Sequence, residues 1–328
     1  MLGGLKRVQP AIDIEVEATW PAEFLAEARK HRALIIDYQR ERQRIDRLVQ
    51  DDVIARTYPP SNRYDTAYRD LVSRLEPELM PHRLVGYHCT RLTPREIAEI
   101  ESGGMRMLTP QLVAEKIAGC VKDGHLTSDR GDFLLHHGSQ IAALRDQHGR
   151  RTGMLWFCAN NSTLRISSGV YRLFRYWGGE ATRGSPAGHP EILREIAHIG
   201  TPCIVKCAIP FVDVQQNGLT FAGRFLSRFV ASEVEYPHPQ ADFDFHTEND
   251  LAGANVLKVI EFASAEFEDL TGSAGWCENE RINLKQGRSD YEDDVRRQEI
   301  DDAPRIATRI EISQAEWTEI SEQLDREV

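Results

Sequence analysis

The chain has 328 residues, 41% hydrophobic and 28% charged, which is enough to bury a sizeable core in one large domain or two smaller ones. Its net charge of −11 excludes a general nucleic-acid binder, because neutralising phosphates requires clustered Lys and Arg. No apolar run approaches the length of a membrane span, and the N-terminus has no signal-peptide core. We therefore expect a cytoplasmic protein without membrane contact.

The first part of the chain predicts two helices. One covers residues 21–56, where Pro21 suits the first helical position and an apolar stripe runs between charged residues. The other covers residues 63–75. We expect residues 1–81 to form a helical N-terminal lobe that docks on its own domain, and a partner-binding arm is the alternative.

The segment 84–91, Leu-Val-Gly-Tyr-His-Cys-Thr-Arg, predicts a β-strand. Its alternation puts Tyr87 and Cys89 on one face and His88 and Thr90 on the other. An imidazole and a hydroxyl side by side can hold the edge of a polar ligand, since both donate and accept hydrogen bonds. The alternative is a buried His bonded to a neighbouring backbone carbonyl.

A helix is predicted directly after this strand. Thr93 is its N-cap, Pro94 takes its first position, and Glu96 completes a capping box. It ends at Gly103 and Gly104. The later elements are a short strand at 105–108, helices at 110–122 and 139–147, a strand at 154–158, a helix at 167–177, a strand at 203–214, a strand or turn at 230–236 and a strand at 255–262. This mixed order favours an α+β sheet over regular βαβ units.

The end of the chain differs in charge from the rest. Past Cys277 there are fifteen acids and eight bases, a local net charge of −7. We expect residues 82–275 to form the second domain and residues 276–328 an acidic extension, with a helix-like stretch at 313–327.

The six cysteines are scattered along the chain. The closest pair, Cys203 and Cys207, has the wrong spacing for a metal or redox motif. We interpret the cysteines as reduced core thiols and expect no structural zinc.

One segment is basic within this acidic chain. Residues 145–183 contain seven Arg and two acidic residues, which gives a local net charge of +5. These residues are Arg145, Arg150, Arg151, Arg165, Arg172, Arg175 and Arg183. They could border an anion site, or they could be ordinary surface residues paired with acids elsewhere.

Three short motifs occur in an order that is characteristic of one family. The first is 87–90, Tyr-His-Cys-Thr, and the second is 153–159, Gly-Met-Leu-Trp-Phe-Cys-Ala, followed by Ser162 and Tyr171. The third is 232–236, Ser-Glu-Val-Glu-Tyr. Together they resemble the His–Tyr–Glu signature of ADP-ribosyltransferases of the diphtheria-toxin and poly-ADP-ribose-polymerase type.

The resemblance spans roughly residues 84–262 and implies an α+β domain with a split mixed or antiparallel sheet. It implies a transferase that cleaves NAD, requires no metal and modifies a macromolecular acceptor, as toxins and defence effectors do. The catalytic residues implied are His88, Tyr171 and Glu235, and the NAD-binding residues implied are Tyr87, Thr90, Arg91, Trp156, Phe157 and Ser162. A carboxylate beside the ribose would stabilise the oxocarbenium-like transition state of nicotinamide release.

The chain departs from the family pattern at several positions. Cys89 stands where the family has Gly, and Trp156 where it often has Tyr. The carboxylate is ambiguous among Glu233, Glu235 and Glu248, and Val-Glu-Tyr favours Glu235.

Two other functions remain open. A toxin-like nuclease could use His88 with Arg residues on RNA, and it would act without NAD. The chain could also be a non-catalytic module that binds a protein partner through the N-terminal helices and has a vestigial cleft. The spacing of Tyr171, Phe174 and Trp177 is also typical of a core stripe.

Overall fold

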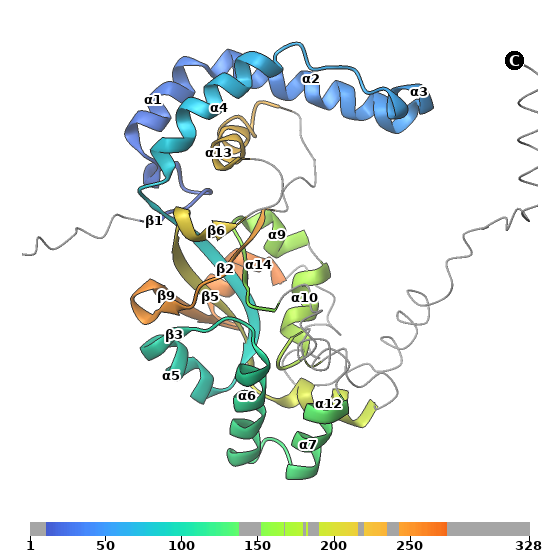
Figure 1. Cartoon of the computed structure of the whole chain (residues 1–328), viewed down its shortest axis with the longest axis vertical. Coiled ribbons are helices and arrows are strands. Elements are labelled where there is room, and N and C mark those ends of the chain that lie inside the picture. The colour runs from blue at the N-terminus through green and yellow to red at the C-terminus, as the bar shows by residue number, and fades with distance from the viewer. Residues whose placement is uncertain are drawn as a thin grey trace, which may run out of the picture. The chain divides into compact units, whose positions relative to one another are not determined.

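The computed structural model describes residues 11–137, 152–166, 168–179, 182, 190–215, 220–234 and 243–273. Over these residues the chain is an α+β protein built on an open, mainly antiparallel sheet (Figure 1). The predictions for 139–147, 276–328 and 313–327 lie outside the described residues.

The sheet is centred on one long strand. Its strands are β1 (Ala11–Ile12), β2 (Arg83–Leu92), β4 (Leu155–Cys158), β5 (Thr201–Pro210), β6 (Val214–Gln215), β7 (Asp244–Thr247) and β9 (Val256–Glu261). Their order is β6–β7–β4–β2–β5–β9, and β1 pairs with β2 off this path. A separate pair joins β3 (Gly104–Met105) to β8 (Leu251–Ala252). β2 pairs with β5 along its whole length, so β2 is the central strand around which the sheet is built.

The other edge of β2 is only partly covered. β1 pairs there with Arg83 and Leu84, and β4 pairs through Tyr87 alone. Among the described strands, residues 88–92 pair only with β5. The sheet therefore splits between β2 and β4 directly after Tyr87.

The N-terminal helices are α1 (Ala22–Lys30), α2 (Arg32–Asp51), α3 (Val53–Thr57) and α4 (Asp65–Leu79). The predicted helix 21–56 is thus interrupted twice, at His31 and at Asp52; Asp52 leaves the helical conformation and caps α3 through the amides of Ile54 and Ala55. α1, α2 and α4 gather around α13 (Phe221–Phe229) (Figure 1). Their apolar side chains share one hydrophobic cluster with a face of the sheet. The proposed domain boundary at residue 81 stays a prediction.

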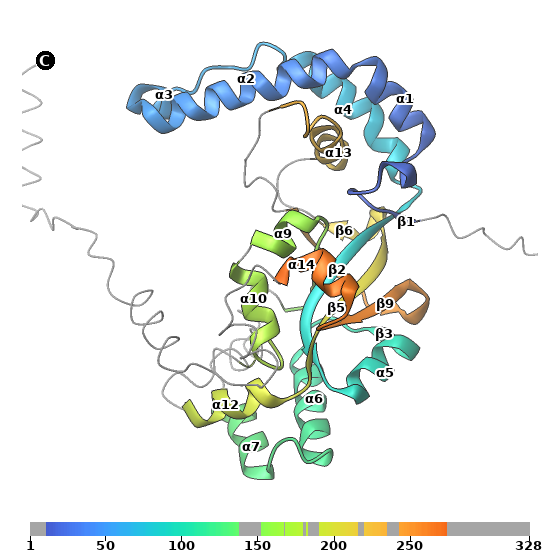
Figure 2. The ribbon, with the colours of Figure 1, turned by 180° about the vertical axis from the view of Figure 1, so that it is seen from behind.

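Further helices cover the opposite face of the sheet. α9 (Asn161–Ile166), α10 (Ser168–Arg175) and α14 (Ala265–Thr271) lie on this side, with α10 beside β2 and β5 (Figure 2). Phe174 and Phe267 pack there against Val85, Tyr87 and Cys89. This placement confirms the predicted alternation of Tyr87 and Cys89 onto one face of β2.

A third hydrophobic cluster lies beyond the split. It joins α6 (Pro110–Lys122), α7 (Ser128–His137) and α12 (Pro190–His198) around Trp177. α5 (Pro94–Gly103) packs against β2, β3 and β9, and its capping box of Thr93 and Glu96 is formed as predicted. Phe174 and Trp177 are fully buried, so these two residues belong to the core.

One predicted strand is wrong, and one open alternative is decided. The strand at 203–214 breaks at Pro210, which lacks an amide donor, and a short 3-10 turn separates β5 from β6. For 230–236 the sequence left a strand or a turn open, and the described part is the turn: a helix ends at Phe229 and residues 231–234 form a turn, so no strand leads into Glu235. Phe221, Phe225 and Phe229 recur every four residues, which is helical spacing.

Candidate functional site

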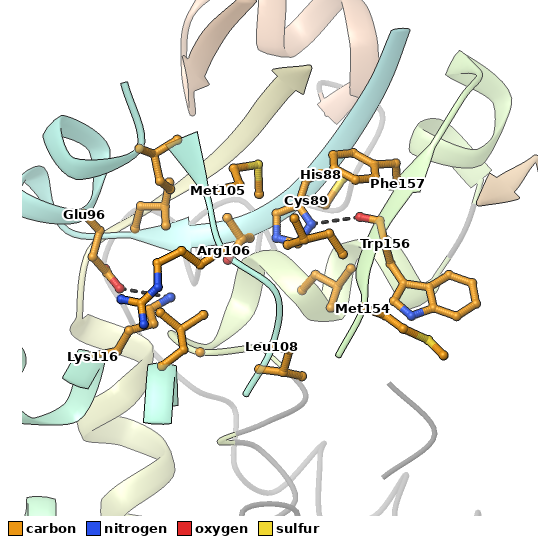
Figure 3. A pocket seen from close by; sticks show the side chains of 18 of the residues that line it. His88, Cys89, Glu96, Met105, Arg106, Leu108, Lys116, Met154, Trp156 and Phe157 are labelled. Carbon is orange, nitrogen blue, oxygen red and sulfur yellow. Dashed lines mark hydrogen bonds and ion pairs between the residues drawn. The ribbon is translucent and has the colours of Figure 1, made fainter. Parts of the chain in front are cut away.

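A cavity of about 620 Å³ opens where β4 leaves β2. Residues 87–90 of β2 and residues 154–158 around β4 line its two sides, and α5 and α6 close its far end. Met105, Leu108 and Met154 supply apolar walls (Figure 3). The size falls within the ~300–1,000 Å³ typical of small-molecule sites.

The far side of the split is closed by backbone. Leu108 donates its amide to the carbonyl of Met154 at 3.3 Å, and Gly153 donates its amide to the carbonyl of Leu108 at 2.9 Å. The segment after β3 therefore pairs with the residues directly before β4. The cavity is the space between these two borders.

His88 bridges the split with its side chain. Its Nδ1 lies 2.8 Å from the carbonyl oxygen of Trp156 (Figure 3). A carbonyl only accepts, so Nδ1 carries the proton and donates. Burial lowers the pKa of His88, which keeps the ring neutral near pH 7. Nε2 is then an acceptor, and it has no hydrogen-bond partner among the described residues.

The second strand of the split supplies an aromatic wall. Trp156 lines the cavity and stacks on His246 of β7, with ring centroids 4.6 Å apart and planes at 30°. His246 thereby holds the indole toward β7. An indole face at a cavity is a platform for a flat ring of a ligand.

β7 also brings a carboxylate to the cavity. Asp244 is exposed, lines the cavity and pairs in the sheet with Cys158. Cys89 and Cys158 line the cavity as well and are free thiols. Burial and the neighbouring Cys89 and Asp244 side chains raise the pKa of the Cys158 thiol, so it stays protonated at neutral pH.

The far end of the cavity holds a buried ion pair. Glu96 of α5 accepts hydrogen bonds from the indole Nε1 of Trp177 at 2.9 Å and from its capping partner, the Thr93 amide, at 2.8 Å. Its other oxygen lies 3.0 Å from Nζ of Lys116 on α6. Burial acts to raise the pKa of Glu96, but the Lys116 charge and these hydrogen bonds outweigh it and hold the pKa below its usual value.

The cavity brings together five of the residues that the sequence predicts for the site. These are His88, Tyr87, Thr90, Trp156 and Phe157. The Tyr87 hydroxyl donates to Asp13 at 2.9 Å, so Tyr87 can offer a ligand only its ring.

Other predicted residues lie elsewhere. Arg91 is buried and donates to the backbone carbonyls of Ile199 and Phe174, so its guanidinium braces the fold. Ser162 lies in α9 and does not line the cavity. Tyr171 lies in α10, but its side chain is outside the described part of the structure.

Of the three candidate catalytic carboxylates, the two that the structure describes do not line the cavity. Glu235 lies outside the described residues. Glu233 forms an ion pair with Arg32 at 2.6 Å. Glu248 is 63% exposed and does not line the cavity.

The basic segment does not supply the cavity's cations in the described part. Arg165 donates to the carbonyl of Asp269, and Arg175 lies over the ring of Tyr176. Neither lines the cavity. The side chains of Arg145, Arg150, Arg151, Arg172 and Arg183 lie outside the described residues.

Three cavity residues were missed by the sequence reasoning. Glu96 was assigned to the capping box alone, although a carboxylate at that position can cap the helix and also line a cavity. Lys116 has no local signal, because only the packing of α6 against α5 brings it to Glu96. Asp244 could be placed only with the strand order in hand.

Comparison with protein-family models, curated proteins and solved structures found no match for the chain. No helix in the described part of the chain is both long and apolar enough to cross a membrane.

Proposed function

We propose that the chain is an NAD-dependent ADP-ribosyltransferase that acts on a macromolecular acceptor, in the manner of a toxin or defence effector. One observation carries the proposal. The strands that bear the first two motifs, far apart in sequence, are neighbours through the pair Tyr87–Cys158 and line the same cavity. A resemblance that arose by chance would have no reason to place both motifs around one cavity.

The side chains at the split suit a nucleotide with a flat ring. His88 offers Nε2 as an acceptor for a ribose hydroxyl, and Thr90 lies on the same strand beside it. The Trp156 indole offers a face on which nicotinamide can stack. The apolar walls exclude water, which would otherwise compete with the acceptor.

The reaction breaks the bond between nicotinamide nitrogen and the ribose C1′. Nicotinamide leaves with the bonding electron pair, and positive charge develops on the ribose. A carboxylate next to C1′ stabilises that charge and takes the proton that the acceptor nucleophile loses when it attacks C1′. The second candidate for this carboxylate, beside Glu235, is Asp244, since it lines the cavity from the strand next to β4.

The proposal is tested with NAD⁺ labelled separately in the nicotinamide and in the adenylate phosphate. The full chain is incubated with each, with and without a cell lysate. We expect release of labelled nicotinamide and transfer of the adenylate label to a macromolecule. His88→Ala should abolish both, with a melting curve to establish that this variant folds.

Each other outcome points to one alternative. RNA cleavage in the absence of NAD⁺ would replace the transferase with a nuclease. Failure of the wild-type chain to release nicotinamide or transfer label, with no nuclease activity, would leave the non-catalytic module.

A further inference from the structure

We propose that Lys116 is the cation that binds the diphosphate of a nucleoside-diphosphate ligand in this cavity, a role that deepens the proposed function and rests on it. The cavity would then hold such a ligand between two poles. The flat ring lies at His88 and Trp156, and the phosphates lie toward Lys116. Figure 3 shows Lys116 on one side of the cavity and Trp156 on the other, with His88 between them.

The burial of the ion pair decides which charge a ligand meets. The Glu96 side chain is 4% exposed and the Lys116 side chain 26%. Both residues line the cavity, and Glu96 uses its other oxygen to accept from Trp177 and Thr93. The ammonium has three donors and gives one to Glu96, so the accessible face of the pair is a cation.

The ammonium is held in place before any ligand binds. Glu96 fixes Nζ at 3.0 Å, and the Trp177 ring lies 5.7 Å from the same atom. A lysine on the surface loses rotamer freedom when it binds a phosphate, whereas Lys116 has already lost much of it. Its charge also acts on His88, where it opposes protonation, so both poles belong to one electrostatic site.

The other cation at the cavity is less suited to this role. Arg106 lines the cavity but is half exposed and forms an ion pair with Glu115. Solvent screens an ion pair between two exposed side chains. Glu115 is itself exposed, so its negative charge repels an incoming phosphate. Glu96 is buried and its charge is balanced by Lys116, Trp177 and the Thr93 amide, so it repels a phosphate less.

The test measures binding by calorimetry of ADP-ribose, ADP, inorganic pyrophosphate and adenosine to the full chain. Lys116→Met keeps most of the apolar stem and removes the charge. We expect it to weaken ADP-ribose and ADP binding by about 10- to 100-fold, the range for a lost charge-assisted hydrogen bond, and to leave adenosine binding unchanged. Lys116→Arg should retain the affinity for ADP.

Lys122→Met is the matched control, because Lys122 lies on the same helix and is exposed outside the cavity. It should leave every affinity unchanged. Lys116→Gln serves as a second variant, with melting curves for both, since loss of the ion pair could weaken the fold.

The outcomes separate the two proposals. Equal ADP affinity in wild type and folded Lys116→Met or Lys116→Gln overturns the role of Lys116 and leaves the transferase standing. ADP binding that depends on Lys116 in a chain that does not cleave NAD⁺ supports the phosphate site and overturns the transferase. A wild-type chain that binds adenosine but neither ADP nor pyrophosphate overturns the phosphate site. So does loss of ADP binding in Lys122→Met equal to that in Lys116→Met.

Discussion

Glu96→Ala tests how much the buried network at the end of the cavity contributes to the fold. The change removes the carboxylate that caps α5 at Thr93, accepts from Trp177 and pairs with Lys116. Loss of the cap costs about 1 kcal/mol. Leaving the buried indole N–H of Trp177 without an acceptor costs about 1–3 kcal/mol more. Lys116 is partly exposed and regains water, so its share is small.

The expected loss in the free energy of unfolding is therefore about 3 kcal/mol. At about 2.1 cal/mol/K of unfolding entropy per residue, this corresponds to a fall of roughly 4–5 °C in melting temperature for a chain of this size. Thermal and urea unfolding of the full chain measure it. Glu99→Ala is the control on the same helix, where Glu99 is 60% exposed and pairs with Arg95. It should cost less than about 1 kcal/mol.

The pH dependence gives a second reading of the same residue. The pKa of Glu96 is lowered in the folded state, since its bonds and the Lys116 charge outweigh the effect of burial. Its contribution is thus complete above the ordinary value of 4.5 and is lost as pH falls through the lowered pKa. The melting temperatures of wild type and Glu96→Ala should converge in acid. If Glu96→Ala costs no more than Glu99→Ala at neutral pH, the reasoning about this network is refuted.

Three further predictions follow from the sheet and the split. Gly86→Ala should destabilise the fold by about 1–3 kcal/mol in urea unfolding, because a Cβ there would lie 2.6 Å from the Phe245 ring; an unchanged midpoint would show that the core has room. His88→Ala should weaken NAD⁺ binding in calorimetry more than it lowers the melting temperature, and the reverse would make His88 structural. Glu235→Gln should lower turnover by about 10²–10³ with little change in NAD⁺ affinity, as expected for a charge felt only in the transition state; if Asp244→Asn has that effect instead, the carboxylate comes from β7.

Much of the local structure could be predicted because its signals are local. The capping box at Thr93 and the helix over 110–122 were found at their observed positions. No element was predicted over 221–229, although the spacing of the Phe residues there is helical. Strand β7 is four residues long, too short for its alternation to stand out.

A residue of the candidate site could be predicted only where it lies in a strand that its local sequence reveals. His88 and Trp156 were found because each lies in a recognisable strand. Lys116 and Asp244 reach the cavity through helix packing and sheet order, which no local pattern encodes. Arg91 was assigned to phosphate because an arginine next to a motif suggests an anion, while its carbonyl partners lie at Phe174 and Ile199.

The uncovered edge of β2 has a consequence for hydrogen exchange. In an antiparallel pair, alternate amides point toward one neighbour and the rest point away. Over residues 88–92 the amides that point away from β5 face the cavity border, so they should exchange with solvent deuterium much faster than their neighbours. A central strand would then show alternating protection along five residues. A ligand seated at that edge would slow the exposed set and leave the other set unchanged.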